Sequence, residues 1–326
     1  MKTKIIYVVV SSASDIYLEQ AWVSIYSLRH FNKDVKVEII CDDRTSERIQ
    51  NHSSQEFLAL VDKVVPVPFD EKVSNRERSR WLKTNMRNFI DGDFLFLDTD
   101  TIITDSLEEI DSFDCNIGMV YSWHCRLSDR PNNKNTFARV ETLYGVKIKD
   151  GVDYFNSGVI YCKNTKESHA FFDKWHAYWE SGKDKPRGIQ DQQSLLATIN
   201  DLGGVEPISG VYNCQPLYSM KYLTSAKIVH FFNLEIGGDP RSLFNTKDFY
   251  LGVKRDGMIS DQNKDLILNC RSTFVAPSLC ICGDDIEIWR SSTFKMLRRI
   301  YAHHRFLYRG LNYLSIKLGG IKTHSF

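Results

Sequence analysis

The 326-residue sequence lacks features that identify several common classes of protein. No run approaches the ~18 apolar residues of a transmembrane helix, and the first apolar run, Ile5 to Val10, is too short for a secretory signal. The eight cysteines stand apart except in Cys280-Ile281-Cys282, so they form neither a disulfide framework nor CxxC zinc pairs. These absences favour a cytoplasmic protein with reduced thiols.

Glycine-rich phosphate loops are also missing. G-x-G-x-x-G does not follow the first apolar run, and G-x-x-x-x-G-K-[ST] does not occur, which excludes the usual dinucleotide and P-loop signatures. The net charge of +1 gives the whole molecule no attraction to anions. Hydrophobic content of 42% and charged content of 25% are those of a globular protein with one large domain or two.

Short apolar runs alternate with amphipathic segments over the first hundred residues, which predicts a mostly parallel central sheet flanked by helices. The strands expected there are 4–10, 35–41, 61–67 and 94–100, and the helices are 18–29, 46–58 and 79–90. Later strands are expected at 115–121, 153–162 and 227–231, helices at 170–180 and 194–200, and a long polar loop at 123–135.

Two carboxylates, Asp98 and Asp100, end the apolar run that begins at Phe94. Residues i and i+2 of a strand point the same way, so the pair should project together at the carboxyl end of the strand, where open α/β sheets bind ligands. Such a pair repels itself unless a cation lies between the two groups, and a hard divalent ion that also binds phosphate suits these oxygen ligands. The alternative is that both residues only end the strand and cap a turn.

Other polar residues have both a structural and a functional interpretation. Lys83 shares a helix face with Arg80 and Arg87, which is either a solvated surface or a phosphate contact next to the carboxylates. Asp191 is either the cap of a helix or a site residue. His230, at the end of a short apolar strand, is either a core residue or a metal ligand.

The end of the chain is basic. From Ile288 to Phe326 there is no acidic residue, and eight lysines and arginines alternate with aromatic and aliphatic residues between Trp289 and Lys322. A basic amphipathic helix binds anionic membrane surfaces, where each cation contributes about 1 kcal/mol. A helix packed on the core and a nucleic-acid patch are the alternatives, but no nucleic-acid module occurs elsewhere in the sequence.

The ordered set of motifs resembles glycosyltransferase family 8, whose members have the GT-A fold. The matching pieces, within roughly residues 4 to 235, are Asp15-x-Tyr17, Lys83, Phe94 to Asp100, Tyr154-Phe-Asn-Ser-Gly158, Asp191-Gln192 and Ile228-Val-His230. The resemblance implies an α/β enzyme of the GT-A (nucleotide-diphospho-sugar transferase) fold. Such an enzyme moves a hexose from a UDP-sugar to a saccharide or lipid-linked acceptor and retains the anomeric configuration.

The resemblance also implies roles for individual residues. Asp98, Asp100 and His230 would ligate Mn²⁺ (or Mg²⁺), which bridges the donor diphosphate. Tyr17 would stack on the base and Asp15 would hydrogen-bond it. The remaining donor-site residues would be Ser12 and Thr99, with Lys83 and Asn156 at the diphosphate and sugar and Asp191 and Gln192 at the reacting face. Of these, Asn156, Asp191 and Gln192 are the catalytic candidates.

The motif that follows His230 departs from the family pattern. The family often follows its histidine with a glycine and then Lys-Pro-Trp, whereas this chain continues from His230 as Phe-Phe-Asn-Leu-Glu-Ile-Gly-Gly-Asp-Pro. Either Arg241 or Lys247 supplies the missing cation, or nothing does.

The resemblance implies a place in the cell as well. Relatives with a similar basic, aromatic tail work on lipid-linked or lipopolysaccharide acceptors, which implies lipopolysaccharide or capsule synthesis at the inner face of the bacterial cell membrane. We expect a GT-A catalytic domain at residues 1–250 and a helical extension at 251–326, basic and aromatic from about 288. The alternatives are a sugar nucleotidyltransferase, which usually has a glycine-rich loop after its first strand, and an inactive glycan-binding relative at the membrane surface.

Overall fold

The computed structural model describes residues 1–52, 54–129, 133–232, 242–274, 288 and 291–319. The chain divides into two compact units, Met1–Phe274 and Val275–Phe326. The expected domain boundary after residue 250 falls within helix α8 (Lys247–Asp256), whose Tyr250 and Val253 are buried in the core of the first unit. Helix α8 and the following helix α9 (Asp261–Leu268) therefore belong to that unit.

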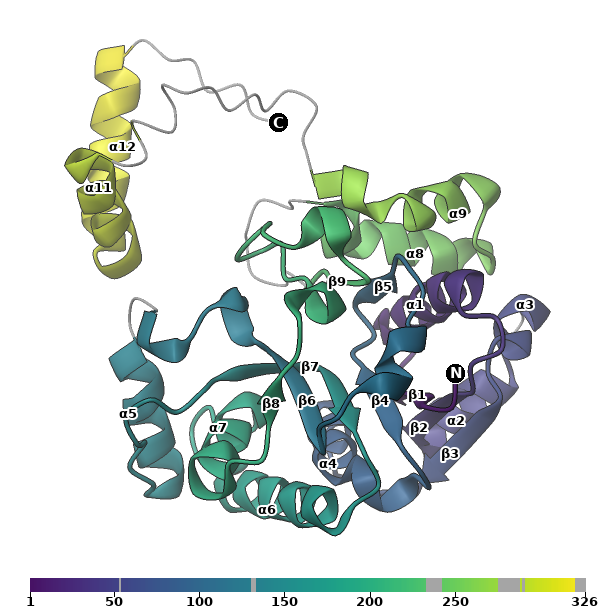
Figure 1. Ribbon diagram of the computed structural model, residues 1–326. Helices are drawn as coiled ribbons and strands as arrows, with labels where there is room; N and C mark the ends of the chain where they lie inside the picture. The colour runs from purple at the N-terminus through teal and green to yellow at the C-terminus, as the bar shows by residue number, and fades with distance from the viewer. Residues whose placement is uncertain (53, 130–132, 233–241, 275–287, 289–290, 320–326) are drawn as a thin grey trace. The chain divides into compact units, whose positions relative to one another are not determined.

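A seven-stranded sheet organises the first unit (Figure 1). Its strands are β1 (Lys4–Val9), β2 (Val37–Asp42), β3 (Lys63–Val67), β4 (Phe94–Leu97), β6 (Ile117–Tyr121), β7 (Phe155–Cys162) and β8 (Glu206–Pro207). They lie in the order β3-β2-β1-β4-β7-β6-β8. β1 is parallel to β2 and β4, whereas β7 is antiparallel to β4 and β6. The mostly parallel sheet expected from the sequence is confirmed.

Helices cover both faces of this sheet (Figure 1). Those on one face are α1 (Tyr17–Phe31), α8 and α9, and those on the other are α4 (Asn75–Asn85), α6 (Lys166–Gly182) and α7 (Asp191–Leu202). Further helices of this unit are α2 (Asp43–Gln50), α3 (Gln55–Ala59) and α5 (Asn133–Tyr144). Successive strand residues serve opposite faces: Tyr7 and Leu95 pack with the first set of helices, and Ile6 and Phe96 with the second. Burial on both faces explains why these strands read as continuous apolar runs.

Two expected elements are divided. The helix predicted at 46–58 is two helices, because α2 ends at Gln50 with Asn51 as its C-cap, and the Ser54 hydroxyl accepts the N–H of Phe57 to begin α3. The strand predicted at 94–100 stops at Leu97, and a separate strand, β5 (Thr101–Ile103), follows. In both cases the residues on either side of the break favour the same type of secondary structure, so the hydrophobic periodicity of the sequence did not reveal the break.

β5 leaves the large sheet and pairs antiparallel with β9 (Ile228–His230). The register places Thr101 opposite His230. The polar segment predicted as a loop at 123–135 contains short 3-10 turns, Ser122–His124 and Leu127–Asp129, and its residues 130–132 lie outside the described part. The prediction was wrong for residues 133–135, because α5 begins at Asn133. The turn from β4 to β5 follows the last residue of β4, so it lies at the carboxyl end of the parallel strands, where this fold class binds ligands.

Six cysteines lie among the described residues, and all are free thiols: Cys41, Cys115, Cys125, Cys162, Cys214 and Cys270. Cys280 and Cys282 lie outside the described residues. Within the described part of the chain, no helix combines the length and the apolar content needed to cross a membrane.

The described residues of the second unit form two helices, α11 (Ser292–His303) and α12 (Arg305–Gly319). The helical C-terminal region expected from the sequence is confirmed. The basic stretch was placed between Trp289 and Lys322, but those two residues lie outside the described part. Large apolar side chains are exposed on both helices, most of all Phe306, which is 88% exposed.

Candidate active site

Asp98 and Asp100 lie in the turn between β4 and β5 rather than along one strand. The backbone N–H of Asp98 donates to the carbonyl of Gly158 at 2.8 Å, and the Thr101 hydroxyl donates to the carbonyl of Asp98 at 2.8 Å. The i, i+2 strand argument was therefore wrong about the local geometry. The turn nevertheless brings both carboxylates to the predicted edge of the sheet.

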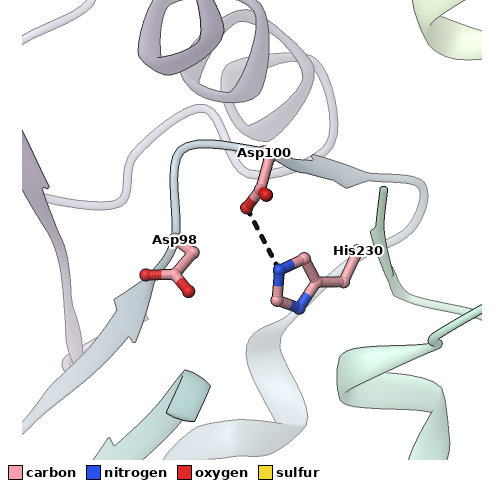
Figure 2. A group of neighbouring side chains, drawn as sticks. All are labelled: Asp98, Asp100 and His230. Carbon is pink, nitrogen blue, oxygen red and sulfur yellow. Dashed lines mark ion pairs between the residues drawn. The ribbon is translucent and has the colours of Figure 1, made fainter. Parts of the chain in front are cut away.

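His230 joins the two carboxylates because β9 pairs with β5 (Figure 2). Its Nε2 lies 3.1 Å from a carboxylate oxygen of Asp100. One ligand atom from each of Asp98, Asp100 and His230 lies within 4.8 Å of the other two. Burial works to raise the pKa of Asp100, but His230, a backbone hydrogen bond and Lys83 together outweigh it, so this pKa lies below its ordinary value.

The orientation of the His230 ring follows from a chain of hydrogen bonds. The backbone N–H of Gly158 donates to Asn156 Oδ1 at 2.9 Å, which identifies that atom as oxygen. Asn213 Nδ2 also donates to it, at 2.8 Å, so Asn213 turns its oxygen toward His230 Nδ1 at 3.1 Å. Since that oxygen only accepts, Nδ1 carries a hydrogen, and Nε2 is the ring nitrogen that faces the carboxylates.

Gly158 is needed where His230 packs. A Cβ atom there would lie 2.1 Å from Cε1 and 2.7 Å from Nδ1 of the His230 ring. The glycine of the Asn-Ser-Gly motif thus makes room for the imidazole, a close approach that only glycine permits.

Two cations and two carboxylates alternate beside this group. Lys83 Nζ lies 2.9 and 3.1 Å from the two oxygens of Asp98 and 3.3 Å from Asp191, and Arg80 Nε lies 3.0 Å from Asp191. The Lys83 side chain is only 4% exposed, so it does not belong to a solvated basic face. Burial would raise the pKa of Asp191, but Lys83 and Arg80, together with the Ser157 and backbone hydrogen bonds, outweigh it and hold that pKa well below the ordinary range. Asp191 is therefore ionised.

Asp191 does not serve as a simple helix cap. α7 begins after Gln190 without a side-chain cap, and the Asp191 carboxylate accepts the Ser157 hydroxyl at 2.9 Å. The same hydroxyl lies 3.2 Å from Gln192 Oε1, and the Gln192 amide donates to the carbonyl of Phe155. Asp191 and Gln192 are thus fixed against the start of β7.

The loop after β1 is held by its own aspartate. Asp15 accepts the Ser11 hydroxyl at 2.6 Å and both the backbone N–H and the hydroxyl of Ser12 at 2.7 Å. The Tyr17 side chain, at the start of α1, is 38% exposed. Thr99 lies in the carboxylate turn, where its hydroxyl is 3.4 Å from Gln20 Oε1. The engagement of both Asp15 oxygens within the loop gives this residue a structural role.

The sequence argument did not select Arg80 or Asn213. Arg80 was recognised only as part of a basic helix face, although its place one turn before Lys83 could have indicated a shared partner. No pattern marks Asn213, which contacts His230 only through the fold. Of the candidates for the missing family lysine, Lys247 begins α8, and Arg241 lies outside the described residues.

Comparisons with known proteins identify the family. The sequence pattern described as glycosyl transferase family 8 matches residues 8–236. None of the curated proteins matches the chain. Among solved structures, an active-site mutant of LgtC is 14% identical with a TM-score of 0.51, over 80% of this chain and 99% of its own.

Two further solved structures are less similar in shape. Mouse xyloside xylosyltransferase 1 is 13% identical with a TM-score of 0.47, over 71% of this chain and 97% of its own. GlyE of Streptococcus pneumoniae TIGR4 is 17% identical with a TM-score of 0.47, over 86% of this chain and 67% of its own. The LgtC structure shows the GT-A fold, and the match over more than half of the sequence shows that this chain belongs to glycosyl transferase family 8 and is a glycosyltransferase.

Proposed function

We propose that this glycosyltransferase uses a divalent cation to transfer a hexose from a UDP-sugar to a saccharide or lipid-linked acceptor, with retention, in lipopolysaccharide or capsule synthesis. The observation that carries the proposal is the cluster of Asp98, Asp100 and His230, in which a histidine nitrogen and two carboxylates converge. Two carboxylates and an imidazole nitrogen that converge in this way suit a shared divalent cation, for which Nε2 would carry no proton.

The donor set fits Mn²⁺ or Mg²⁺. Carboxylate oxygens suit hard divalent cations, and one imidazole nitrogen is compatible with Mn²⁺. Asn213 holds the second ring nitrogen of His230, as outer-shell partners of metal-bound histidines do. When bound, such a cation would act as a Lewis acid toward the diphosphate that leaves the sugar.

The protein's own residues supply the remaining electrostatics. Lys83 lies between Asp98 and Asp191, where its ammonium can turn from a carboxylate to a phosphate oxygen and balance the charge of the leaving group. Asp191 stays ionised beside Gln192, so a negative charge faces the region where positive charge develops on the sugar. Asn156 immediately precedes Ser157, the partner of Asp191, and its own side-chain oxygen accepts Asn213 Nδ2. Asp191 acts either as a nucleophile or as an electrostatic partner.

The nucleotide end of the donor is proposed to lie at the loop after β1. Tyr17 would offer its exposed ring to the base. Asp15 would act mainly by holding Ser12 and the loop backbone in shape, because its oxygens already accept four donors there, including the backbone N–H of Tyr17. Thr99 would lie between this loop and the cation.

Release of UDP tests this proposal. The wild-type chain should release UDP slowly from one member of a panel of UDP-sugars in the presence of Mn²⁺. EDTA should abolish the release, and so should the double substitution Asp98→Asn and Asp100→Asn. Release from no donor, together with UDP binding that does not depend on Mn²⁺, would contradict the proposal and would favour an inactive glycan-binding relative. Membership of the glycosyltransferase family removes the nucleotidyltransferase alternative.

We further propose that the second unit binds an anionic membrane surface, which would place the enzyme at the inner face of the cell membrane. α11 and α12 contain no acidic residue. Phe306, Leu307 and Leu314 are more than half exposed, near Arg305 and Arg309. Exposed apolar side chains beside cations suit a surface of anionic headgroups over acyl chains.

Vesicle sedimentation tests the membrane proposal. The full chain should sediment with phosphatidylglycerol vesicles at low salt, and a chain that ends at Gly283 should stay in the supernatant. Equal sedimentation of the two chains would contradict the proposal. Vesicles of phosphatidylcholine are the matched control, because they offer the same acyl chains without the negative charge.

A further inference from the structure

Three aromatic side chains form a row beside His230: Trp123, Tyr218 and Phe232, hereafter the aromatic row. The rings of Trp123 and Tyr218 are stacked with centroids 4.7 Å apart. Tyr218 meets Phe232 at 5.5 Å, and Phe232 stacks on the His230 imidazole at 4.0 Å. Trp123 is 36% and Tyr218 44% exposed. The row therefore connects a solvent-accessible aromatic surface with the cation cluster.

The backbone beneath this surface is held in an uncommon conformation. φ is 65° at Trp123 and 56° at His124, in the left-handed region that bulky residues rarely adopt. The buried Gln215 fixes both: its Oε1 accepts the N–H of Trp123 at 2.8 Å, and its own N–H donates to His124 Nε2 at 2.8 Å. Strain that the surrounding structure maintains is typical of ligand sites. Here it presents an indole ring at the surface.

The sheet determines where the aromatic row lies along the active-site edge. β6 ends just before Trp123, and it ends at the same edge as β1 and β4, because β7 is antiparallel to both β4 and β6. The order along this edge is the loop with Tyr17, the carboxylate turn and then the aromatic row. Two strand spacings, roughly 10 Å, separate β4 from β6, which is on the scale of a disaccharide.

We infer that Trp123 and Tyr218 form a binding site for a pyranose ring of the acceptor saccharide. One face of a pyranose carries mainly C–H bonds, which stack on the electron-rich face of an aromatic ring while the hydroxyls stay hydrated. The inference rests on the proposed function, since it assigns the nucleotide to the opposite side of the carboxylates. One sugar unit of the acceptor would bind on the aromatic row, and the reacting hydroxyl of the neighbouring unit would then lie near the cation cluster.

Saturation-transfer NMR with methyl glycosides tests this site directly. The probes are the methyl β-glycosides of glucose and galactose and the methyl α-glycoside of mannose, each added to the full chain without a donor. Saturation should be strongest on the C–H protons of one sugar face. Trp123→Ala and Tyr218→Ala should each weaken binding by about tenfold, whereas Trp123→Phe and Tyr218→Phe should retain most of it.

The controls keep the outcomes distinct. Leu202→Ala removes another exposed apolar side chain, 52% exposed at the end of α7, and should leave the glycoside signals unchanged. Trp123→Gly suits the left-handed backbone and replaces Trp123→Ala if that variant does not fold.

Two results would overturn the inference. One is the absence of face-selective saturation from every glycoside with the wild type, and the other is equal saturation in the wild type and the alanine variants. Face-selective binding that the alanine variants lose would support the inference even if no UDP-sugar were turned over. In that case the transferase proposal alone would fail, because this measurement involves no donor.

Discussion

Gly158→Ala should disturb the proposed cation site by displacing the His230 ring. The new methyl group would begin 2.1 Å from His230 Cε1, and an ordinary contact begins near 3.4 Å, so the ring would have to move by more than 1 Å. His230 has little room, because it is 2% exposed, stacks on Phe232 and is bonded to Asn213. Overpacking of this kind costs roughly 1–3 kcal/mol of folding stability.

The displacement should also weaken cation binding. Changes in the outer shell of a metal site typically cost roughly 10- to 100-fold in affinity, and here the ligand itself would move away from Asp100. Urea denaturation would measure the loss of stability, and titration with Mn²⁺ in the presence of UDP would measure the affinity.

Gly252→Ala is the matched control. Gly252 lies inside α8, and no heavy atom lies within 4 Å of a Cβ built there. Alanine should therefore stabilise the helix by up to about 1 kcal/mol and leave Mn²⁺ binding unchanged. If Gly158→Ala kept native stability and native Mn²⁺ affinity, the account of how His230 is positioned would be refuted.

Three further substitutions test other parts of the structure. Asp191→Asn would leave Lys83 with one carboxylate fewer and should lower the rate of UDP release by roughly 100-fold. It should also lower the free energy of unfolding, measured by urea denaturation, by about 3 kcal/mol. Burial, with a smaller effect of Lys221, lowers the pKa of His124 from 6.5 to about 4. The folded protein thus binds this proton less readily than the unfolded chain, so stability should be full above pH 6.5 and fall as the pH drops toward 4. His124→Gln should reduce that slope in urea midpoints measured across this range. Arg78 pairs with Asp42 at 2.7 Å, and both side chains are buried, so Arg78→Met should lower stability by about 3–5 kcal/mol, whereas the double variant with Asp42→Leu should lose less.

Much of the first unit could be predicted from the sequence because its strands are buried on both faces. Runs such as Phe94 to Leu97 are continuous, and amphipathic helices separate the early runs from one another. The order of the strands could not be derived in this way. The antiparallel entry of β7 and the pairing of β5 with β9 depend on contacts between residues far apart in the chain.

Only part of the candidate site could be predicted from the sequence. Asp98 and Asp100 were chosen because two carboxylates follow a buried strand, although a turn and not strand geometry brings them together. Arg80 and Asn213 were missed because their partners, Asp191 and His230, lie far from them in the sequence. The dual role of a polar side chain, as in Asp15, also becomes visible only when its hydrogen bonds are known.

Electron paramagnetic resonance of Mn²⁺ tests the central claim most directly, because the free aqueous ion gives a strong six-line signal that weakens on binding. With UDP present, the wild-type chain should deplete this signal at a stoichiometry of about one ion per chain. Asp98→Asn, Asp100→Asn and His230→Ala should each restore the signal, and Gly252→Ala should not. Depletion that persists in all three site variants would show that the ion binds elsewhere and would contradict a cation site at Asp98, Asp100 and His230.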